Sequence, residues 1–171
     1  MQFEAHVKQI IRQTPDVKSF RFDRPMGMDC FAGQYMIVTI KSDGKELREP
    51  FTISSSPTER DYLEFTKKLT GHPFSKALEA LKVGDKVLIE APFGEFTFKG
   101  EVDTIALIAG GIGITPLRCI IRYATDNQLK TNIILLYSNR YEDEIVQERT
   151  RRHAEAKQKS QSREYYNKTQ R

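Results

Sequence analysis

The feature that most constrains this fold is a succession of strand, glycine loop, helix and strand near the end of the chain. TIALIA (104–109) is a continuous apolar run, which is typical of a strand buried on both faces. GGIGITP (110–116) follows, then a predicted helix of about 116–127, then a second apolar run, NIILLY (132–137). This order predicts one βαβ unit of a parallel sheet.

The residues before this unit predict a different architecture. Six short segments mix β-branched or aromatic residues with polar ones, and turn sequences separate them. They are FEAHVKQII, VKSFRFD, QYMIVTI, EPFTISSS, DYLEFTKKL and KVLIEA, with one short helix at about 74–81 between the last two. Six strands of this kind favour a closed antiparallel barrel over a sandwich. We therefore expect a barrel over residues 1–99 and an α/β unit over residues 102–146.

The glycine loop predicts an anion site. Gly110, Gly111 and Gly113 leave backbone N–H groups unobstructed, and Thr115 and Pro116 suit the N-cap and the first position of a helix. A helix N-terminus of this kind can hold a pyrophosphate. The loop matches neither G-x-G-x-x-G nor a P-loop, so it indicates a nucleotide phosphate in general terms, and a tight turn without ligand is the alternative.

The stretch REPFTISSSP (48–57) carries a second candidate site. Arg48 offers a cation to a phosphate, Phe51 a ring that could stack on a flat group, and Thr52 a hydroxyl. Pro50 lacks an N–H, which argues against a central strand. The alternative is that Phe51 belongs to the core, Thr52 is an ordinary strand residue and Arg48 is solvated.

Two further motifs follow in order. TGHPFSKAL (70–78) places Gly71 before a short helix with Ser75 near its start, which is either a second phosphate site or an ordinary capped helix. GDKV (84–87) and PFGEF (92–96) come next, before the glycine loop. With the R-x-P-F-T stretch, this order resembles the ferredoxin–NADP⁺ reductase superfamily over residues 2–146.

The resemblance implies an antiparallel Greek-key barrel that binds FAD, or less readily FMN, followed by an incomplete parallel α/β nucleotide-binding domain. It also implies hydride transfer from NADH or NADPH to the flavin, and electron transfer to a ferredoxin-like protein or a small-molecule acceptor. A non-catalytic flavin-binding fragment, or an electron-transfer subunit that needs a partner, is the alternative.

The resemblance also implies roles for individual residues. Thr52, near flavin N5, and Thr115, beside the nicotinamide nucleotide, would be catalytic residues. The residues that would hold FAD are Arg48, Pro50, Phe51, Thr52, Thr66, Lys67, Lys68, Gly71 and Ser75. The residues that would hold NAD(P)H are Gly110, Gly111, Gly113, Thr115, Ser138 and Arg140, of which Ser138 and Arg140 would meet a 2′-phosphate or else be a solvated strand end.

The chain departs from the family pattern at two places. Many members have Arg two residues before the aromatic, whereas Glu49 and Pro50 intervene here, and Glu49 takes the His position of the variant H-P-F-T. The C-G-P motif that lies beside the nicotinamide in relatives is also absent from this sequence.

The last 25 residues, 147–171, have a different composition. They hold eight Lys or Arg and three Asp or Glu, a net charge of +5, and no Val, Ile, Leu, Met or Phe. Permitted codons for Val146 onward, read one base later, encode an amphipathic segment of the family kind. We therefore hypothesise a frameshift or truncation, with a disordered tail or isolated helix, against the alternative of a divergent natural tail.

Composition narrows the remaining classes. Residues 1–146 hold 19 basic and 20 acidic side chains, so we expect no nucleic-acid partner. Cys30 and Cys119 lack metal-ligand spacing, and no metal site is expected. The N-terminus does not resemble a signal peptide and no apolar run reaches the roughly 18 residues of a membrane span, so a cytoplasmic protein is expected.

Overall fold

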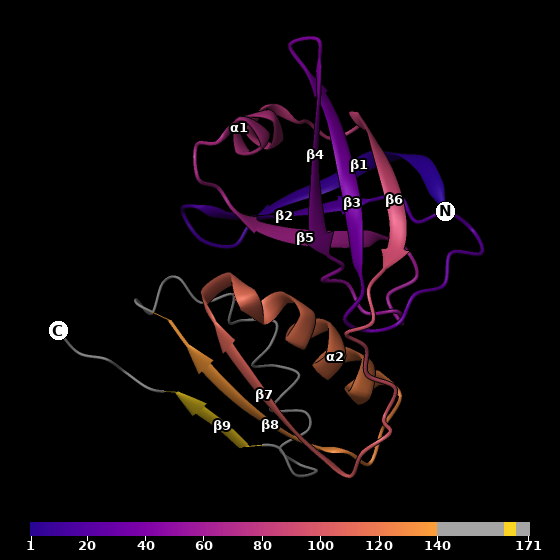
Figure 1. Ribbon diagram of the computed structural model, residues 1–171, viewed down its shortest axis with the longest axis vertical. Coiled ribbons are helices and arrows are strands. Elements are labelled where there is room, and N and C mark those ends of the chain that lie inside the picture. The colour runs from indigo at the N-terminus through magenta and orange to yellow at the C-terminus, as the bar shows by residue number, and fades with distance from the viewer. Residues whose placement is uncertain (140–162, 167–171) are drawn as a thin grey trace, which may run out of the picture.

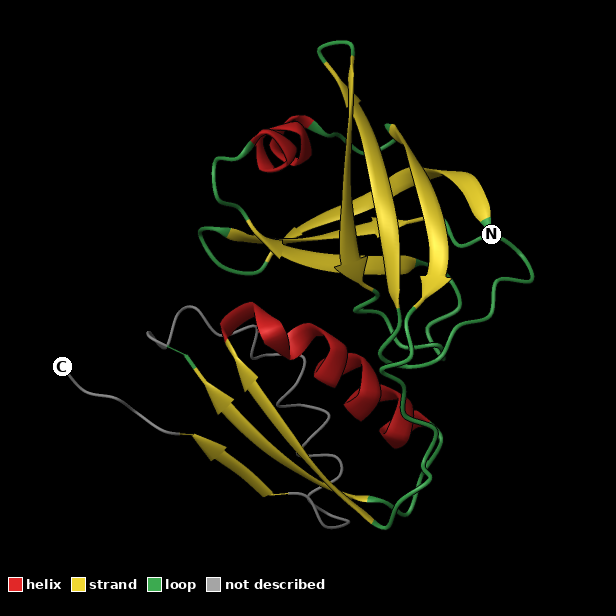
Figure 2. Ribbon diagram, viewed as in Figure 1, coloured by secondary structure: helices red, strands yellow, loops and turns green. Residues whose placement is uncertain are grey.

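Alternation of buried and exposed side chains builds most of the first hundred residues into one antiparallel sheet. In β3 (Tyr35–Ser42), Met36, Val38 and Ile40 are buried, the two-residue period of a strand with one face on a core. The other strands are β1 (Gln2–Arg12), β2 (Val17–Phe22), β4 (Lys45–Thr52), β5 (Leu63–Lys68) and β6 (Lys86–Phe93). Their order is β4-β3-β6-β1-β2-β5, with every neighbouring pair antiparallel. The return of β6 between β3 and β1 agrees with the Greek-key barrel expected from the sequence (Figures 1 and 2).

The computed structural model describes residues 1–139 and the strand at 163–166. Within this part, the sheet curls until its two edge strands, β4 and β5, cross near one another (Figure 1). Phe51 of β4 stacks on Phe65 of β5 with ring centroids 4.3 Å apart. A backbone bond from Ser54 N–H, just past β4, to the Glu64 carbonyl also joins the edges. The sheet curls as the predicted barrel requires, but no β4–β5 strand ladder closes it. Pro50 lies on the edge strand β4, where its missing N–H costs least.

The helix α1 (Pro73–Ala80) covers one opening of the barrel. Its buried residues Phe74, Ala77 and Leu78 follow helical spacing and join the barrel core. It begins one residue earlier than the sequence suggested, because Pro73 takes the first helical position, which suits a residue without an N–H.

The predicted βαβ unit is confirmed. β7 (Thr104–Gly110) and β8 (Asn132–Ser138) pair in parallel, from Thr104 opposite Asn132 to Gly110 opposite Ser138. The helix α2 (Ile114–Asp126) connects them and lies between their sheet and the barrel (Figure 1). Of the helices that the structure describes, none is long and apolar enough to cross a membrane.

The start of α2 differs from the expectation. A 3₁₀ turn, η1 (Gly111–Gly113), runs directly into the helix, and the N-cap is Gly113. The N–H of Ile114 already bonds the carbonyls of Gly111 and Ile112, so helical hydrogen bonding begins before Thr115. The predicted N-cap role of Thr115 is therefore wrong, and this residue lies in the first helical turn.

The predicted strand EPFTISSS also ends early. β4 stops at Thr52, and the next serines, Ser54, Ser55 and Ser56, are fully buried without belonging to a strand. Side chains of α2 bond the carbonyls of Ser54 and Ser55. Because these polar groups find partners on the helix, the segment does not need a neighbouring strand.

A short strand, β9 (Arg163–Tyr166), lies in the basic tail. It pairs in parallel with β8, with residue 163 opposite Ile134. The expectation of disorder or an isolated helix is wrong for these four residues, because the free edge of β8 offers backbone groups for pairing. Residues 140–162, which include Arg140, and residues 167–171 lie outside the described part of the chain.

The aromatic stack predicts the stability of the barrel. Phe65 is fully buried and also stacks on Phe20 and Phe22, with centroids 5.3 and 5.6 Å apart. Phe65→Ala should lower the free energy of unfolding by about 3–5 kcal/mol, as expected for a large buried side chain. Urea denaturation measures this change.

The matched control is Phe96→Ala, because Phe96 is 62% exposed. A loss for Phe65→Ala no larger than that for Phe96→Ala would contradict the assignment of Phe65 to the centre of the core.

Candidate functional site

An aromatic ring and a cation meet where β4 ends. Phe51 is partly exposed, and its ring is backed by Phe65 and, at 5.3 Å, by Phe74 of α1. The Nζ of Lys67, on β5, lies 5.3 Å from the centroid of the Phe51 ring. Glu49 shares the strand face of Phe51, and its carboxylate pairs with Lys67 at 3.2 Å. We call Phe51, Lys67 and Glu49 the barrel mouth; Thr52 ends β4 beside it, on the other strand face.

Arg48 does not join the barrel mouth. Successive strand residues point to opposite faces, so Arg48 lies on the other face from Phe51. Its Nη2 is 2.9 Å from Oε1 of Glu90 on β6, and its Nε also donates to that oxygen. Pro50 shares the face of Arg48. The sequence motif located the strand correctly, but the extra residue before Phe51 turns the arginine away from it.

Thr66 and Lys68 also face away from the barrel mouth. The Thr66 hydroxyl is buried, 2.7 Å from the Ser19 hydroxyl. Lys68 pairs with Asp16 at 3.1 Å, and this contact holds the pKa of Asp16 below its usual value. Of the three predicted β5 residues, Lys67 is therefore the one whose side chain lies beside Phe51.

The turn into α1 presents open backbone. Gly71 has φ +72°, and a Cβ there would meet no atom within 4 Å. Ser75 is fully buried, and its hydroxyl accepts the N–H of Thr70, which braces the turn. His72 occupies the N-cap without a side-chain cap. No side chain therefore caps the start of α1, and Gly71 leaves open space in front of it, as a diphosphate would require.

The glycine loop is equally open. Gly111 has φ +50°, a conformation that favours glycine, and a Cβ at Gly111 or Gly113 would meet no atom within 4 Å. The Tyr137 hydroxyl, at the end of β8, donates to the Gly111 carbonyl at 2.9 Å and fixes the loop. Ser138 is exposed opposite Gly110 in the sheet register. The carboxyl ends of parallel strands, where this loop lies, are where α/β folds bind nucleotides.

The glycine loop lies close to the barrel. The turn η1 of the glycine loop lies beside β5, the strand that carries Lys67. Thr115 follows in the first turn of α2 and is 8% exposed. The structure therefore brings the glycine loop next to the strand of the barrel mouth.

Sequence reasoning missed the residues that join the two parts of the chain. Arg118 of α2 is 6% exposed, donates to the Ser54 carbonyl and lies 3.4 Å from a carboxylate oxygen of Glu64. The signals were present: an arginine on the apolar face of a predicted helix, a glutamate inside the apolar strand segment LEF, and three consecutive serines.

Cys119 is a packing residue of the same contact. Its Sγ donates to the Ser55 carbonyl at 3.2 Å. Burial raises the pKa of the Cys119 thiol to about 12, and burial also raises the pKa of Cys30. Both cysteines are free thiols and stay neutral at physiological pH.

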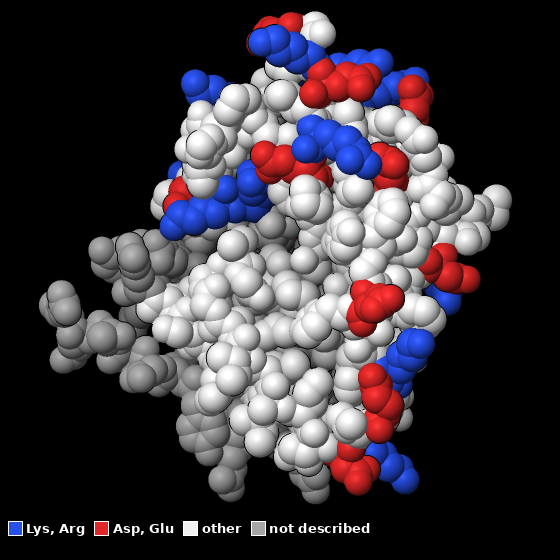
Figure 3. Space-filling view, in the orientation of Figure 1, with Lys and Arg blue, Asp and Glu red and all other residues white. Residues whose placement is uncertain are grey.

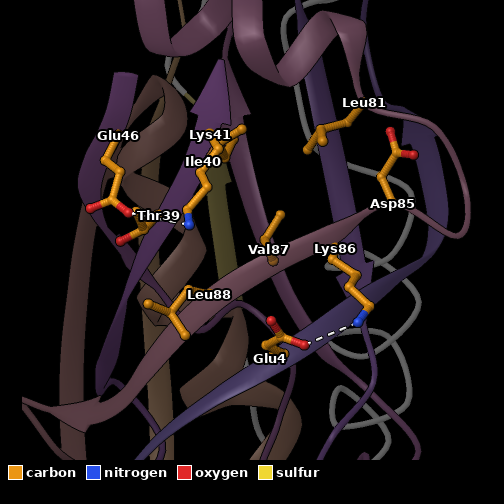
Figure 4. Close-up of a pocket in the computed structure, with 10 residues that line it drawn as sticks. All are labelled: Glu4, Thr39, Ile40, Lys41, Glu46, Leu81, Asp85, Lys86, Val87 and Leu88. Atoms are coloured by element: carbon orange, nitrogen blue, oxygen red, sulfur yellow. Dashed lines mark hydrogen bonds and ion pairs between the residues drawn. The ribbon is translucent and has the colours of Figure 1, made fainter. Parts of the chain in front are cut away.

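A separate pocket of about 400 Å³ lies elsewhere on the barrel (Figure 4). Its walls come from β1, β3, β4, β6 and the connection after α1. Two exposed ion pairs, Lys86 with Glu4 at 3.1 Å and Lys41 with Glu46 at 3.6 Å, lie along it. None of the predicted site residues lines it. On the face that Figure 3 draws, basic and acidic side chains lie mixed over the upper part and down one side, and the middle of the face carries few charges.

Two family models match the chain in the order that the fold shows. The oxidoreductase FAD-binding domain matches residues 4–98, and the oxidoreductase NAD-binding domain matches residues 107–171. The second match includes the basic tail. The frameshift hypothesis and the domain limits at residues 99 and 102 stay predictions.

Similar proteins carry reductase names. NADH-cytochrome b5 reductase 2 of Mycosarcoma maydis is 31% identical over 84% of this chain and 44% of its own length. The glycine betaine monooxygenase reductase subunit of Chromohalobacter salexigens is 29% identical over 85% of this chain and 41% of its own length. The chain thus spans less than half the length of these two curated relatives.

Solved structures show the same fold. The cytochrome b5 reductase domain of Ulva prolifera nitrate reductase superposes with a TM-score of 0.81 at 27% identity, over 97% of this chain and 72% of that one. A ferredoxin-NADP+ reductase from Plasmodium falciparum gives 0.84 at 16% identity, over 96% of this chain and 72% of that one. With matches to an FAD-binding and an NAD-binding domain in sequence, the chain belongs to the oxidoreductase FAD-binding domain family.

Proposed function

We propose that this protein accepts a hydride from NADH or NADPH on bound FAD and passes the electrons to an acceptor. The observation that carries the proposal is the adjacency of the glycine loop and β5. A nucleotide phosphate bound by this open loop would lie beside the barrel mouth. Bound FAD would supply the redox chemistry of this reaction, and the protein supplies position and electrostatics.

The barrel mouth is suited to hold a flavin. Phe51 offers a partly exposed ring, and the stack on Phe65 and Phe74 holds that ring in place. Thr52 is partly exposed at the end of β4, where its hydroxyl can hydrogen-bond a flavin ring nitrogen. The unobstructed turn at Gly71 is suited to a diphosphate, with Ser75 as its internal brace. In this proposal Lys67 supplies the positive charge that the family pattern would assign to an arginine.

The glycine loop is suited to hold the nicotinamide nucleotide. The backbone N–H groups of its helix N-terminus favour the pyrophosphate, and Thr115 lies in the same turn. In this proposal Ser138 and Arg140 contact the ribose, and a 2′-phosphate there would distinguish NADPH from NADH. A flavin and a nicotinamide held side by side would react without diffusing, which is the main rate advantage that the protein provides.

The acceptor belongs to the proposal as well. The names of the relatives include a cytochrome b5 reductase and reductase components of monooxygenases. We propose a redox protein of comparable kind as the acceptor, with a small molecule as the simpler possibility. A cytoplasmic location is part of the proposal and is compatible with two free thiols.

Reduction of the flavin by nicotinamide nucleotides tests the function. The purified chain is supplied with FAD, freed of excess cofactor and mixed anaerobically with NADH or NADPH while flavin absorbance is recorded. Retention of FAD and bleaching by either nucleotide would support the proposal, and the faster nucleotide identifies the donor. A chain that retains FAD and is not bleached would be the flavin-binding fragment instead, and a chain that takes up neither FAD nor FMN would contradict both.

Replacing each of the two candidate cations by methionine tests which of them binds the flavin phosphate. Lys67→Met removes a cation beside Phe51 and should weaken FAD binding roughly tenfold, the size of one charge-assisted hydrogen bond. Arg48→Met, the matched control, removes a cation from the opposite strand face and should change the dissociation constant less than twofold. Fluorescence quenching of added FAD measures both.

A third variant tests whether the charge of Lys67 is what favours FAD binding. Glu49→Gln frees Lys67 from its ion pair, so FAD should bind more tightly. A stronger loss with Arg48→Met than with Lys67→Met would show that the family arrangement, with the arginine on the phosphate, applies despite the extra residue.

A branched side chain in the glycine loop should separate the two sites. Gly111→Val fills the open approach and is strained at φ +50°, so NAD(P)⁺ binding should be lost while FAD binding stays unchanged. Gly44→Val is the control, because Gly44 has φ +72° and equally open surroundings in the β3–β4 hairpin. Calorimetric titration with NAD(P)⁺ measures the difference. Equal loss of nucleotide in both variants would mean that strain, and not blocked access, is the cause.

A further inference from the structure

One buried guanidinium joins the helix of the glycine loop to the barrel. Arg118 lies in the second turn of α2, and its Nη1 donates to the Ser54 carbonyl and lies 3.4 Å from Oε1 of Glu64. All three residues are at most 6% exposed. A charge buried to this degree needs compensating partners, and here both partners belong to the barrel.

Glu64 is the centre of this contact. Its Oε2 accepts a hydrogen bond from Nε of Arg21 at 2.7 Å, and its Oε1 accepts the Ser54 hydroxyl at 3.2 Å. Arg21 in turn lies over the Tyr62 ring at 4.0 Å and bonds Gln9. The carboxylate therefore has strong donors from three different segments: β2, the serine segment and α2. We call Arg21, Glu64 and Arg118 the buried charge triad.

The groups that meet at the triad lie close in sequence to both proposed sites. Ser54 follows Thr52, which ends β4 at the barrel mouth, by two residues. Arg118 follows Thr115, in the first turn of α2 after the glycine loop, by three residues. Two more bonds run along the same helix, from Cys119 to the Ser55 carbonyl and from Thr58 to Asp126. Movement of α2 against the serine segment would thus break the Arg118 bonds together with these two.

We propose that Arg118 is a positioning residue for hydride transfer: by clamping α2 to Ser54 and Glu64, it sets the distance between the glycine loop and Thr52. This inference rests on the proposed function. An arginine suits the task because its guanidinium is planar, stays charged and bonds a carbonyl and a carboxylate together. Arg118 touches neither proposed ligand site and acts through the helix that carries one of them.

The test uses the full chain loaded with FAD and three variants. Arg118→Met removes the clamp, Arg118→Lys keeps the charge, and Arg12→Met is the matched control. Arg12 also donates to backbone carbonyls, those of Thr14 and Pro15, but lies on the exposed side of β1. Stopped-flow absorbance then gives the rate of flavin reduction at saturating NADH or NADPH, together with the concentration that gives half of it.

A positioning role predicts a specific pattern. In Arg118→Met the limiting rate should fall roughly 10²-fold, the effect of a misplacement of about 1 Å, with FAD affinity unchanged. Arg118→Lys should recover most of the rate, and Arg12→Met should equal the unmodified chain. If Arg118→Met does not fold, Arg118→Gln takes its place, because it can still donate to Ser54 while losing the ion pair, and it should be roughly 10-fold slower. Limiting rates within twofold of the unmodified chain would overturn the proposal.

Differential scanning calorimetry tests the contact between α2 and the barrel independently of the proposed function. The unmodified chain should unfold in one transition, and Arg118→Met should show a separate, earlier transition for the α2 unit. If the unmodified chain binds FAD but no nucleotide reduces it, the proposed function fails while calorimetry still tests the clamp. A single, cooperative transition in Arg118→Met would overturn the clamp whatever the activity.

Discussion

The contact between Glu64 and Arg118 is the interaction on which the relation of the two parts depends. Neither charge has access to water, so each relies on the other and on Arg21 and Ser54 for compensation. A buried ion pair adds little to stability compared with apolar packing, but it tolerates few geometries. We therefore infer that the pair fixes the position of α2 on the barrel.

The alternation of strand residues decides which side chains can serve the barrel mouth. One extra residue between the arginine and the aromatic of β4 turns Arg48 toward Glu90 and brings Glu49 beside Phe51. The positive charge there comes from Lys67 on the neighbouring edge strand. The family motif and the strand geometry thus differ on which cation lies beside Phe51. The strand geometry is the stronger guide, because a side chain cannot change faces without a shift of register.

The sequence predicted the elements that local patterns determine. The βαβ unit, the six strands and the two glycine-led helix starts follow from periodicity and turn residues, and the structure contains them. It did not predict where Thr115 lies in its helix, because the turn at Gly111 to Gly113 begins the helical bonds early. Nor did it predict the buried charge triad or the partner of Arg48, since those contacts join residues 42 to 64 positions apart.

The central claim is that the barrel and the α2 unit form one cooperative body joined at the buried charge triad. Native-state hydrogen exchange of the unmodified chain tests it most directly. The account predicts that the amides of Ser54 and Glu64, on the barrel side, and those of Arg118 and Cys119, on the helix side, exchange through one opening with the same free energy. Helix amides that exchange on the order of 100-fold faster than those of Glu64 and Ser54 would show two independent bodies, and would contradict it.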